Sequence, residues 1–269
     1  MKMDTKIITK VVFIILTAVS ACWAGCSTTK PCDIHGKKQV DEVEVVLKQL
    51  NMKTKQLKSY QAQVEYKFIQ PAFESTSLRK GELFYKVSGK KSKLRVNFST
   101  LKQDDEKEQK YREEFIFDGI WLAHINYQIK QVRMHQLAEP NKPVGAFELA
   151  ARNLPIVGFA GIEDLRKQFE IILVDQKEDN RNDFIQLHLI VKPDSKYKDK
   201  YTAIDFWIDK KIYLPARVVA ISTEEDIYHI KLINPKVNKK LSNDIFDVEI
   251  PKGFGKEIIP LKEKDKSKM

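Results

Sequence analysis

The sequence lacks the short motifs that mark many catalytic and nucleotide-binding sites. It contains no HExxH, GxSxG, P-loop or GxGxxG pattern, and none of its five histidines has a second histidine or a cysteine at metal-ligand spacing. It has only three cysteines, and no two of them form a CxxC pair. We therefore predict no metal site, no cofactor and no catalytic residue, although catalytic side chains dispersed through a fold would leave no such motif.

A long apolar run is also missing. The run Val11–Val19 is well short of the about 20 residues that a membrane-crossing helix needs, and no later segment comes close to that length. The run follows three lysines within the first ten residues and precedes the small residues Ser20 and Ala21. This layout is typical of an export signal. We therefore predict a signal peptide over residues 1–21 and a mature protein in the bacterial cell envelope, facing the periplasm.

Three processing sites compete at the end of this signal. The segment VSAC (Val19–Cys22) matches a lipobox, in which the cysteine thiol receives a diacylglyceryl group and becomes the new N-terminus. Alternatively, ordinary signal peptidase cuts after Ala24, or Cys26 carries the lipid, although Trp23 fits its aliphatic position badly. We favour Cys22, with residues 22–37 as a polar tether. The outer membrane is favoured over the inner one because the residue after Cys22 is not aspartate.

Acidic residues are fewer than basic ones, at 37 aspartates and glutamates against 47 lysines and arginines. Such a surplus favours contact with anionic lipid head groups or with nucleic acid. An exported protein does not meet nucleic acid, so we expect none as a partner. A soluble basic surface explains the surplus equally well.

One helix precedes a long series of strands. Val43, Val46, Leu47 and Leu50 repeat at helical spacing, which predicts an amphipathic helix over residues 38–58. Apolar and polar residues then alternate, as they do in strands with one buried face. The predicted strands are Tyr60–Phe68, Leu83–Val87, Leu94–Phe98, Tyr111–Phe117, Trp121–Tyr127, Gln131–Leu137, Phe169–Val174, Phe184–Val191, Ala203–Ile208, Leu214–Ile221 and Ile227–Ile233. The pattern predicts one continuous curved antiparallel sheet with helices on one face, the second helical stretch being FELAARNL (Phe147–Leu154).

Four segments resemble the LolA/LolB-like superfamily of periplasmic lipoprotein carriers and lipoprotein-sorting proteins. They are the helix with the strand that follows it, FDGIWLAHINYQIKQVRM (Phe117–Met134), LAARNL (Leu149–Leu154), and the run from Asp205 to Phe254, in which Phe246, Pro251 and Gly253 take the places of the family's ending. The resemblance spans most of residues 38–255. It implies a mainly β fold with helices (α+β): an unclosed antiparallel half-barrel of about eleven strands with a helical lid. We place this domain at residues 38–262 and a charged tail at 263–269.

The resemblance also implies an apolar cavity on the concave side that receives the acyl chains of lipids or lipoproteins, for lipoprotein sorting or transfer. Acyl chains need such cover, because each buried methylene is worth about 0.8 kcal/mol. A packed core would place the same side chains inward, so the alternation leaves both possibilities open. The residues expected to line the cavity are Val64, Tyr66, Leu83, Tyr85, Phe115, Phe117, Trp121, Ile125, Leu149, Leu154 and Phe159.

The segment Gly145–Gly161 is the predicted lid. Its glycines allow backbone rotation, and it carries more apolar side chains than a solvated loop should. The alternative is a static helix that plugs the barrel. Val87 takes the place of the family's lid-gating arginine, so we expect apolar contact to hold the lid closed.

Two other functions remain open. The fold could serve as a protein-binding or envelope-sensing module, which a groove blocked by side chains would favour. It could also serve a periplasmic hydrolase, the less favoured alternative, which a buried polar cluster with a shifted pKa would support. In each case we expect a monomer.

Overall fold

The computed structural model describes residues 34–89, 91–146, 162–174 and 183–261. The predicted signal peptide, the tether up to residue 33 with Cys22, the stretch FELAARNL, nearly all of the predicted lid and the charged tail lie outside these residues. In the part that the structure describes, no helix is both long enough and apolar enough to cross a membrane.

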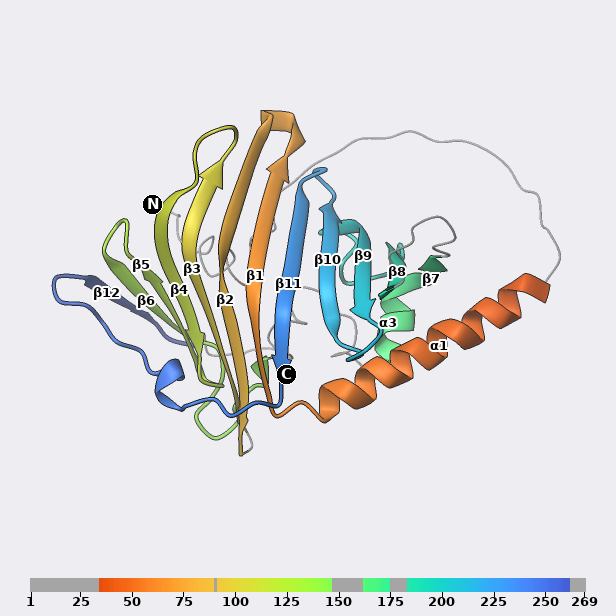
Figure 1. Ribbon diagram of the computed structural model, residues 1–269, viewed down its shortest axis with the longest axis horizontal. Helices are drawn as coiled ribbons and strands as arrows, with labels where there is room; N and C mark the ends of the chain where they lie inside the picture. The colour runs from red at the N-terminus through yellow and green to blue at the C-terminus, as the bar shows by residue number, and fades with distance from the viewer. Residues whose placement is uncertain (1–33, 90, 147–161, 175–182, 262–269) are drawn as a thin grey trace, which may run out of the picture.

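A single twelve-stranded sheet forms the body of the protein (Figure 1). Its strands lie in the order β12-β6-β5-β4-β3-β2-β1-β11-β10-β9-β8-β7, so that β1 and β11 are central and β12 and β7 form the two edges. The strands are β1 (Ser59–Gln70), β2 (Ser75–Ser88), β3 (Lys91–Gln103), β4 (Gln109–Phe117), β5 (Trp121–Asn126), β6 (Gln131–Gln136), β7 (Phe169–Val174), β8 (Phe184–Val191), β9 (Tyr201–Asp209), β10 (Pro215–Ser222), β11 (Ile227–Val237) and β12 (Gly255–Ile259). The predicted fold class, a mainly β, unclosed half-barrel with helices, is confirmed.

Neighbouring strands are antiparallel except at one edge, where β12 runs parallel to β6. All eleven strands that the alternation predicts are present, and β12 is the additional one. Its five residues, GKEII, show little apolar alternation and are mostly exposed. A short polar strand at a sheet edge leaves almost no periodic signal in a sequence.

Helix α1 (Ile34–Lys55) confirms the predicted amphipathic helix, which begins four residues earlier than expected, inside the predicted tether. Val43, Val46, Leu47 and Leu50 are buried in the main apolar cluster. The helix packs against β7 and against the short helix α3 (Ile162–Gln168), on the right of Figure 1. We call the sheet face that shares this cluster the inner face, and the opposite face the outer face.

The C-terminal segment, residues 238–259, covers part of the outer face. It includes the short 3-10 helix η3 (Asp244–Phe246), whose Phe246 packs with Phe84 and Leu241. Further along, Phe254 packs against a second cluster formed by Ile116, Ala123, Ile125 and Val132. Strands β4 and β5 are therefore covered on both faces, which explains why both of their faces are apolar.

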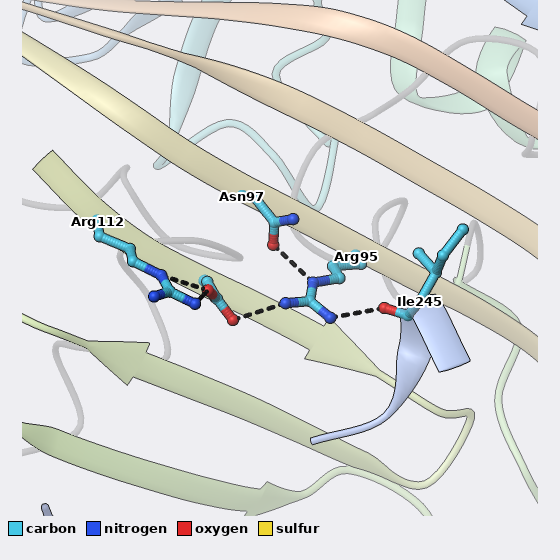
Figure 2. Close-up of polar contacts among 5 residues, drawn as sticks. Arg95, Asn97, Arg112 and Ile245 are labelled. Atoms are coloured by element: carbon cyan, nitrogen blue, oxygen red, sulfur yellow. Dashed lines mark hydrogen bonds and ion pairs between the residues drawn. The ribbon is translucent and has the colours of Figure 1, made fainter. Parts of the chain in front are cut away.

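Arg95 on β3 ties η3 to the sheet (Figure 2). Its Nη1 donates to the carbonyl oxygen of Ile245 at 2.7 Å, its Nε to Asn97 Oδ1 at 2.7 Å, and its Nη2 to Glu114 Oε2 at 2.8 Å. Glu114 is 4% exposed and also accepts a hydrogen bond from Arg112 Nε at 2.9 Å. Both carboxylate oxygens of Glu114 and all three nitrogens of Arg95 are thus directed at partners, as charges removed from water require.

Candidate functional site

The middle of the inner face carries aliphatic side chains that are only half-buried. Flanking residues such as Phe117 and Phe206 are 0% exposed, as core side chains are. On the central strands, several inner residues instead keep part of their surface accessible. Five aliphatic ones, which we call the apolar floor, are Leu83, Val96, Val218, Ile230 and Leu232.

The strand register makes this floor continuous. Leu83 lies opposite Val96 across β2 and β3, and Ile230 lies opposite Val218 across β11 and β10. Between them, Val64 on β1 lies opposite Leu232 on one side and Gly81 on the other. The floor residues therefore lie on four strands, two on each side of β1, where Val64 is 4% exposed.

Gly81 leaves a side-chain gap in this floor. A Cβ at this position would lie 1.8 Å from the backbone oxygen of Asn97, because β2 and β3 approach closely at a register shift beside Gly81. Only glycine fits such an approach. The close approach of the two strands therefore excludes a side chain from the space opposite Val64.

A polar cluster lies beside the floor on the same face. Glu113, 6% exposed, is its centre: Oε1 lies 2.8 Å from His124 Nε2, and Oε2 accepts a hydrogen bond from Tyr111 Oη at 2.9 Å. Arg79 Nε lies 3.8 Å from the same Oε2. The ring of His124 stacks on Phe115, with centroids 4.3 Å apart.

These contacts determine the charge of Glu113. Burial by itself raises the pKa of this carboxyl, but the hydrogen bond from His124 and the positive charge of Arg79 act against it, so that the pKa lies below its usual range. Glu113 is therefore ionised at neutral pH. A carboxylate only accepts hydrogen bonds, so His124 donates from Nε2.

Among the described residues, two donors of this cluster have no hydrogen-bond acceptor: Tyr66 Oη and Arg79 Nε. Tyr66 is 8% exposed, and burial raises the pKa of its hydroxyl well above the usual value. Tyr66 lies directly opposite Arg79 on β2 and directly opposite Ile230 on β11. The unpaired donors therefore adjoin the apolar floor.

The structure brings six of the predicted cavity residues together in the inner cluster: Val64, Tyr66, Leu83, Tyr85, Phe115 and Phe117. Leu149, Leu154 and Phe159 lie outside the described residues. Whether the inner side chains border a cavity stays a prediction.

The placement of Trp121 and Ile125 on the inner face is wrong. On β5, Leu122 and His124 lie opposite the inner residues Phe117 and Phe115, so the alternation turns Trp121 and Ile125 outward. Ile125 is 0% exposed and packs in the outer cluster with Phe254. The apolar character of the outer positions reflects the C-terminal segment, which the strand pattern by itself does not reveal.

The sequence patterns did not identify three residues of the polar cluster, Arg79, Glu113 and His124, as site residues. A signal was available in YREEFIF (Tyr111–Phe117), where Glu113 shares the parity of the inner residues Phe115 and Phe117. A carboxylate at an inner position of a strand is rarely buried without partners. Within the ranges that the structure describes, no group of three or more His, Cys, Asp or Glu side chains could hold a metal ion.

No protein-family model and no curated protein matches the chain. Solved structures are similar to it at low sequence identity. An uncharacterized conserved protein from Thermus thermophilus is 12% identical, with 82% of this chain and 99% of that chain covered and a TM-score of 0.48. A chain of the MucA/MucB complex of Pseudomonas aeruginosa is 13% identical, with 77% of this chain and 61% of that chain covered and a TM-score of 0.46.

A LolA superfamily protein is also among them. It comes from Nitrosomonas europaea and is 12% identical, with 76% of this chain and 97% of that chain covered and a TM-score of 0.37. This is the superfamily that the sequence motifs resemble. Similarity at this level does not define a ligand, so the function is argued from the residues of this chain.

Proposed function

We propose that the protein is an envelope lipoprotein whose inner face binds the acyl chains of lipids or lipoproteins non-covalently, for lipoprotein sorting or transfer. In this proposal it works as a monomer in the periplasm, anchored through a lipid on Cys22, in the outer membrane in preference to the inner one. The observation that carries the binding function is the apolar floor, where aliphatic side chains in the centre of the sheet stay partly accessible.

The floor suits a cargo that must be released again. Apolar contact with an acyl chain has no preferred direction, and each methylene removed from water contributes about 0.8 kcal/mol. A chain of ordinary length therefore binds through many weak contacts without any covalent step. The same contacts can be lost one after another when a second apolar surface receives the chain.

The polar cluster does not favour the hydrolase alternative. A hydrolase with a serine, threonine or cysteine nucleophile needs that hydroxyl or thiol within hydrogen-bond distance of its general base. Over the described part of the chain, His124 has no such partner, and its Nε2 is engaged with Glu113. Both oxygens of Glu113 in turn have donors, which is typical of a structural or binding cluster.

Leu232→Gln is expected to weaken the binding of a fluorescent fatty-acyl probe by about tenfold, which corresponds to about 1.4 kcal/mol. The substitution puts a polar amide in the apolar floor, where it has no partner on the probe. The matched control is Ile233→Gln, the next residue of β11, which is also half-buried but lies on the outer face. Equal affinities of the two variants for the probe in a fluorescence titration would contradict the inner-face site. If neither the natural protein nor any variant binds the probe, the result would favour the protein-binding module.

The proposed lipid anchor at Cys22 can be tested separately. Labelled palmitate should be incorporated when the full chain is expressed in a bacterial host, and Cys22→Ser should abolish the label. Cys26→Ser is the control and should leave the label unchanged. Loss of label in the Cys26 variant alone would move the anchor to that cysteine, and label in neither the natural protein nor the variants would exclude a lipid anchor.

A further inference from the structure

We infer that the ligand carries an oxyanion, a carboxylate or a phosphate, at the head of its acyl chain, and that Tyr66 and Arg79 bind this group at the end of the apolar floor. The inference rests on the proposed function, because it adds a head-group site to the acyl-binding face. It names the chemical class of the ligand, which the floor by itself leaves open.

The first reason is the two unpaired donors. Within the part of the chain that the structure describes, Tyr66 Oη has no hydrogen-bond partner although the residue is only 8% exposed, and Arg79 Nε has none either. Buried donors without acceptors are rare in folded proteins because each gives up its hydrogen bonds to water and receives none in return. Tyr66 and Arg79 lie opposite each other in the strand register, so the two donors together offer a place for one acceptor.

The second reason is that Glu113 forms an ion pair with Arg79 but accepts no hydrogen bond from its Nε. Its nearest carboxylate oxygen lies 3.8 Å from Arg79 Nε, beyond hydrogen-bond distance, and that oxygen already accepts from Tyr111. The guanidinium instead lies over the ring of Tyr111, with its central carbon 5.4 Å from the ring centroid. Arg79 thus keeps donor capacity for a planar oxyanion, the group that guanidinium binds best.

The third reason is the position of Tyr66 between Arg79 and the apolar floor. Tyr66 stands between Arg79 and the floor residue Ile230 in the strand register. A head group held by Tyr66 and Arg79 would direct its acyl chain over Ile230 and Leu232, along β11. The polar and apolar halves of one amphiphile would then both find matching surfaces on the inner face.

The test compares charged and neutral heads on the same chains. Purified full-length protein is titrated with a fluorescent fatty acid and its methyl ester, and with a fluorescent phosphatidic acid and the matching diacylglycerol. We expect the charged member of at least one pair to bind about tenfold more tightly than its neutral partner. The pair that shows the preference identifies the oxyanion as carboxylate or phosphate.

Tyr66→Phe is the decisive variant, because it removes only an unpaired hydroxyl. We expect it to abolish most of the charged-head preference without lowering the thermal stability. Arg79→Met should lose the preference as well, and Arg79→Lys should keep part of it. Tyr60→Phe is the matched control, since Tyr60 is on the same face of β1, is 5% exposed and also has an unpaired hydroxyl, but lies opposite Tyr85 instead of an arginine.

The possible outcomes separate the two proposals. If neutral and charged heads bind equally, or if Tyr66→Phe keeps the full preference, the head-group site is excluded while the acyl-binding face stands. If no probe of either kind binds, the proposed function itself is excluded. A preference that Tyr66→Phe and Arg79→Met both remove, and that Tyr60→Phe keeps, would establish the site.

Discussion

Glu114→Ala is expected to lower the free energy of unfolding by about 3 to 5 kcal/mol, the usual result of removing one partner from a buried ion pair. Glu114 is the carboxylate that faces both Arg95 and Arg112, and the side chain of Arg95 is only 17% exposed. Without Glu114, Arg95 keeps its charge away from water and loses its counter-ion. Urea denaturation followed by circular dichroism measures the change.

Glu82→Ala is the matched control for this prediction. Glu82 is an exposed glutamate on the outer face of β2, so its removal should change the free energy of unfolding by less than about 0.5 kcal/mol. In the Glu114 variant the C-terminal segment should also become more sensitive to protease, because Arg95 ties it to the sheet through Ile245. Coincident denaturation curves for the two variants would contradict this account of the ion pair.

Gly81→Ala is expected to destabilise the protein by about 3 kcal/mol or more. The added Cβ would meet the backbone oxygen of Asn97 at 1.8 Å, the backbone carbon of Asn97 at 2.7 Å and the Cα of Phe98 at 2.8 Å. All three atoms belong to the main chain of β3, so no side chain can rotate away. The strands β2 and β3 must separate, and the centre of the inner face is disturbed.

Gly255→Ala provides the comparison. The nearest atom to a Cβ at Gly255 is the backbone oxygen of Lys130 at 4.0 Å, which is ordinary contact. This variant should unfold within about 0.5 kcal/mol of the natural protein. If the two alanine variants have the same thermal midpoint in calorimetry, the close approach of β2 and β3 does not require glycine.

The fold was predictable because the sequence patterns that indicate its strands and its helix are local. Alternation along the strands and the helical repeat of Val43, Val46, Leu47 and Leu50 depend only on neighbouring residues, and both are confirmed. Which face of a strand points inward is not local information. On β5 both faces are apolar because different segments cover them, so Ile125 could not be assigned by period alone.

The polar residues of the candidate site could not be predicted from the sequence, for a related reason. Inner positions of a strand are expected to hold apolar residues, and charged residues are expected to be solvated. Glu113 is buried because Tyr111, His124 and Arg79 converge on it from β4, β5 and β2, and this convergence arises only when the strands pair. Spacing along β4 shows only that Tyr111 and Glu113 share a face with Phe115 and Phe117, and not that His124 and Arg79 approach them.

The central place of β1 determines the order in which the sheet can be completed. Strands β1 to β6 pair in sequence along the chain, as do β7 to β11, so each half can form through local hairpins. The seam between the halves joins β1 to β11, with Val64 opposite Leu232, and it closes only after most of the chain has been made. Contacts between residues so distant in sequence slow folding, because the entropy of loop closure is lost before they form. Until that seam closes, β1 and β11 each present one unpaired edge, at which other chains can pair.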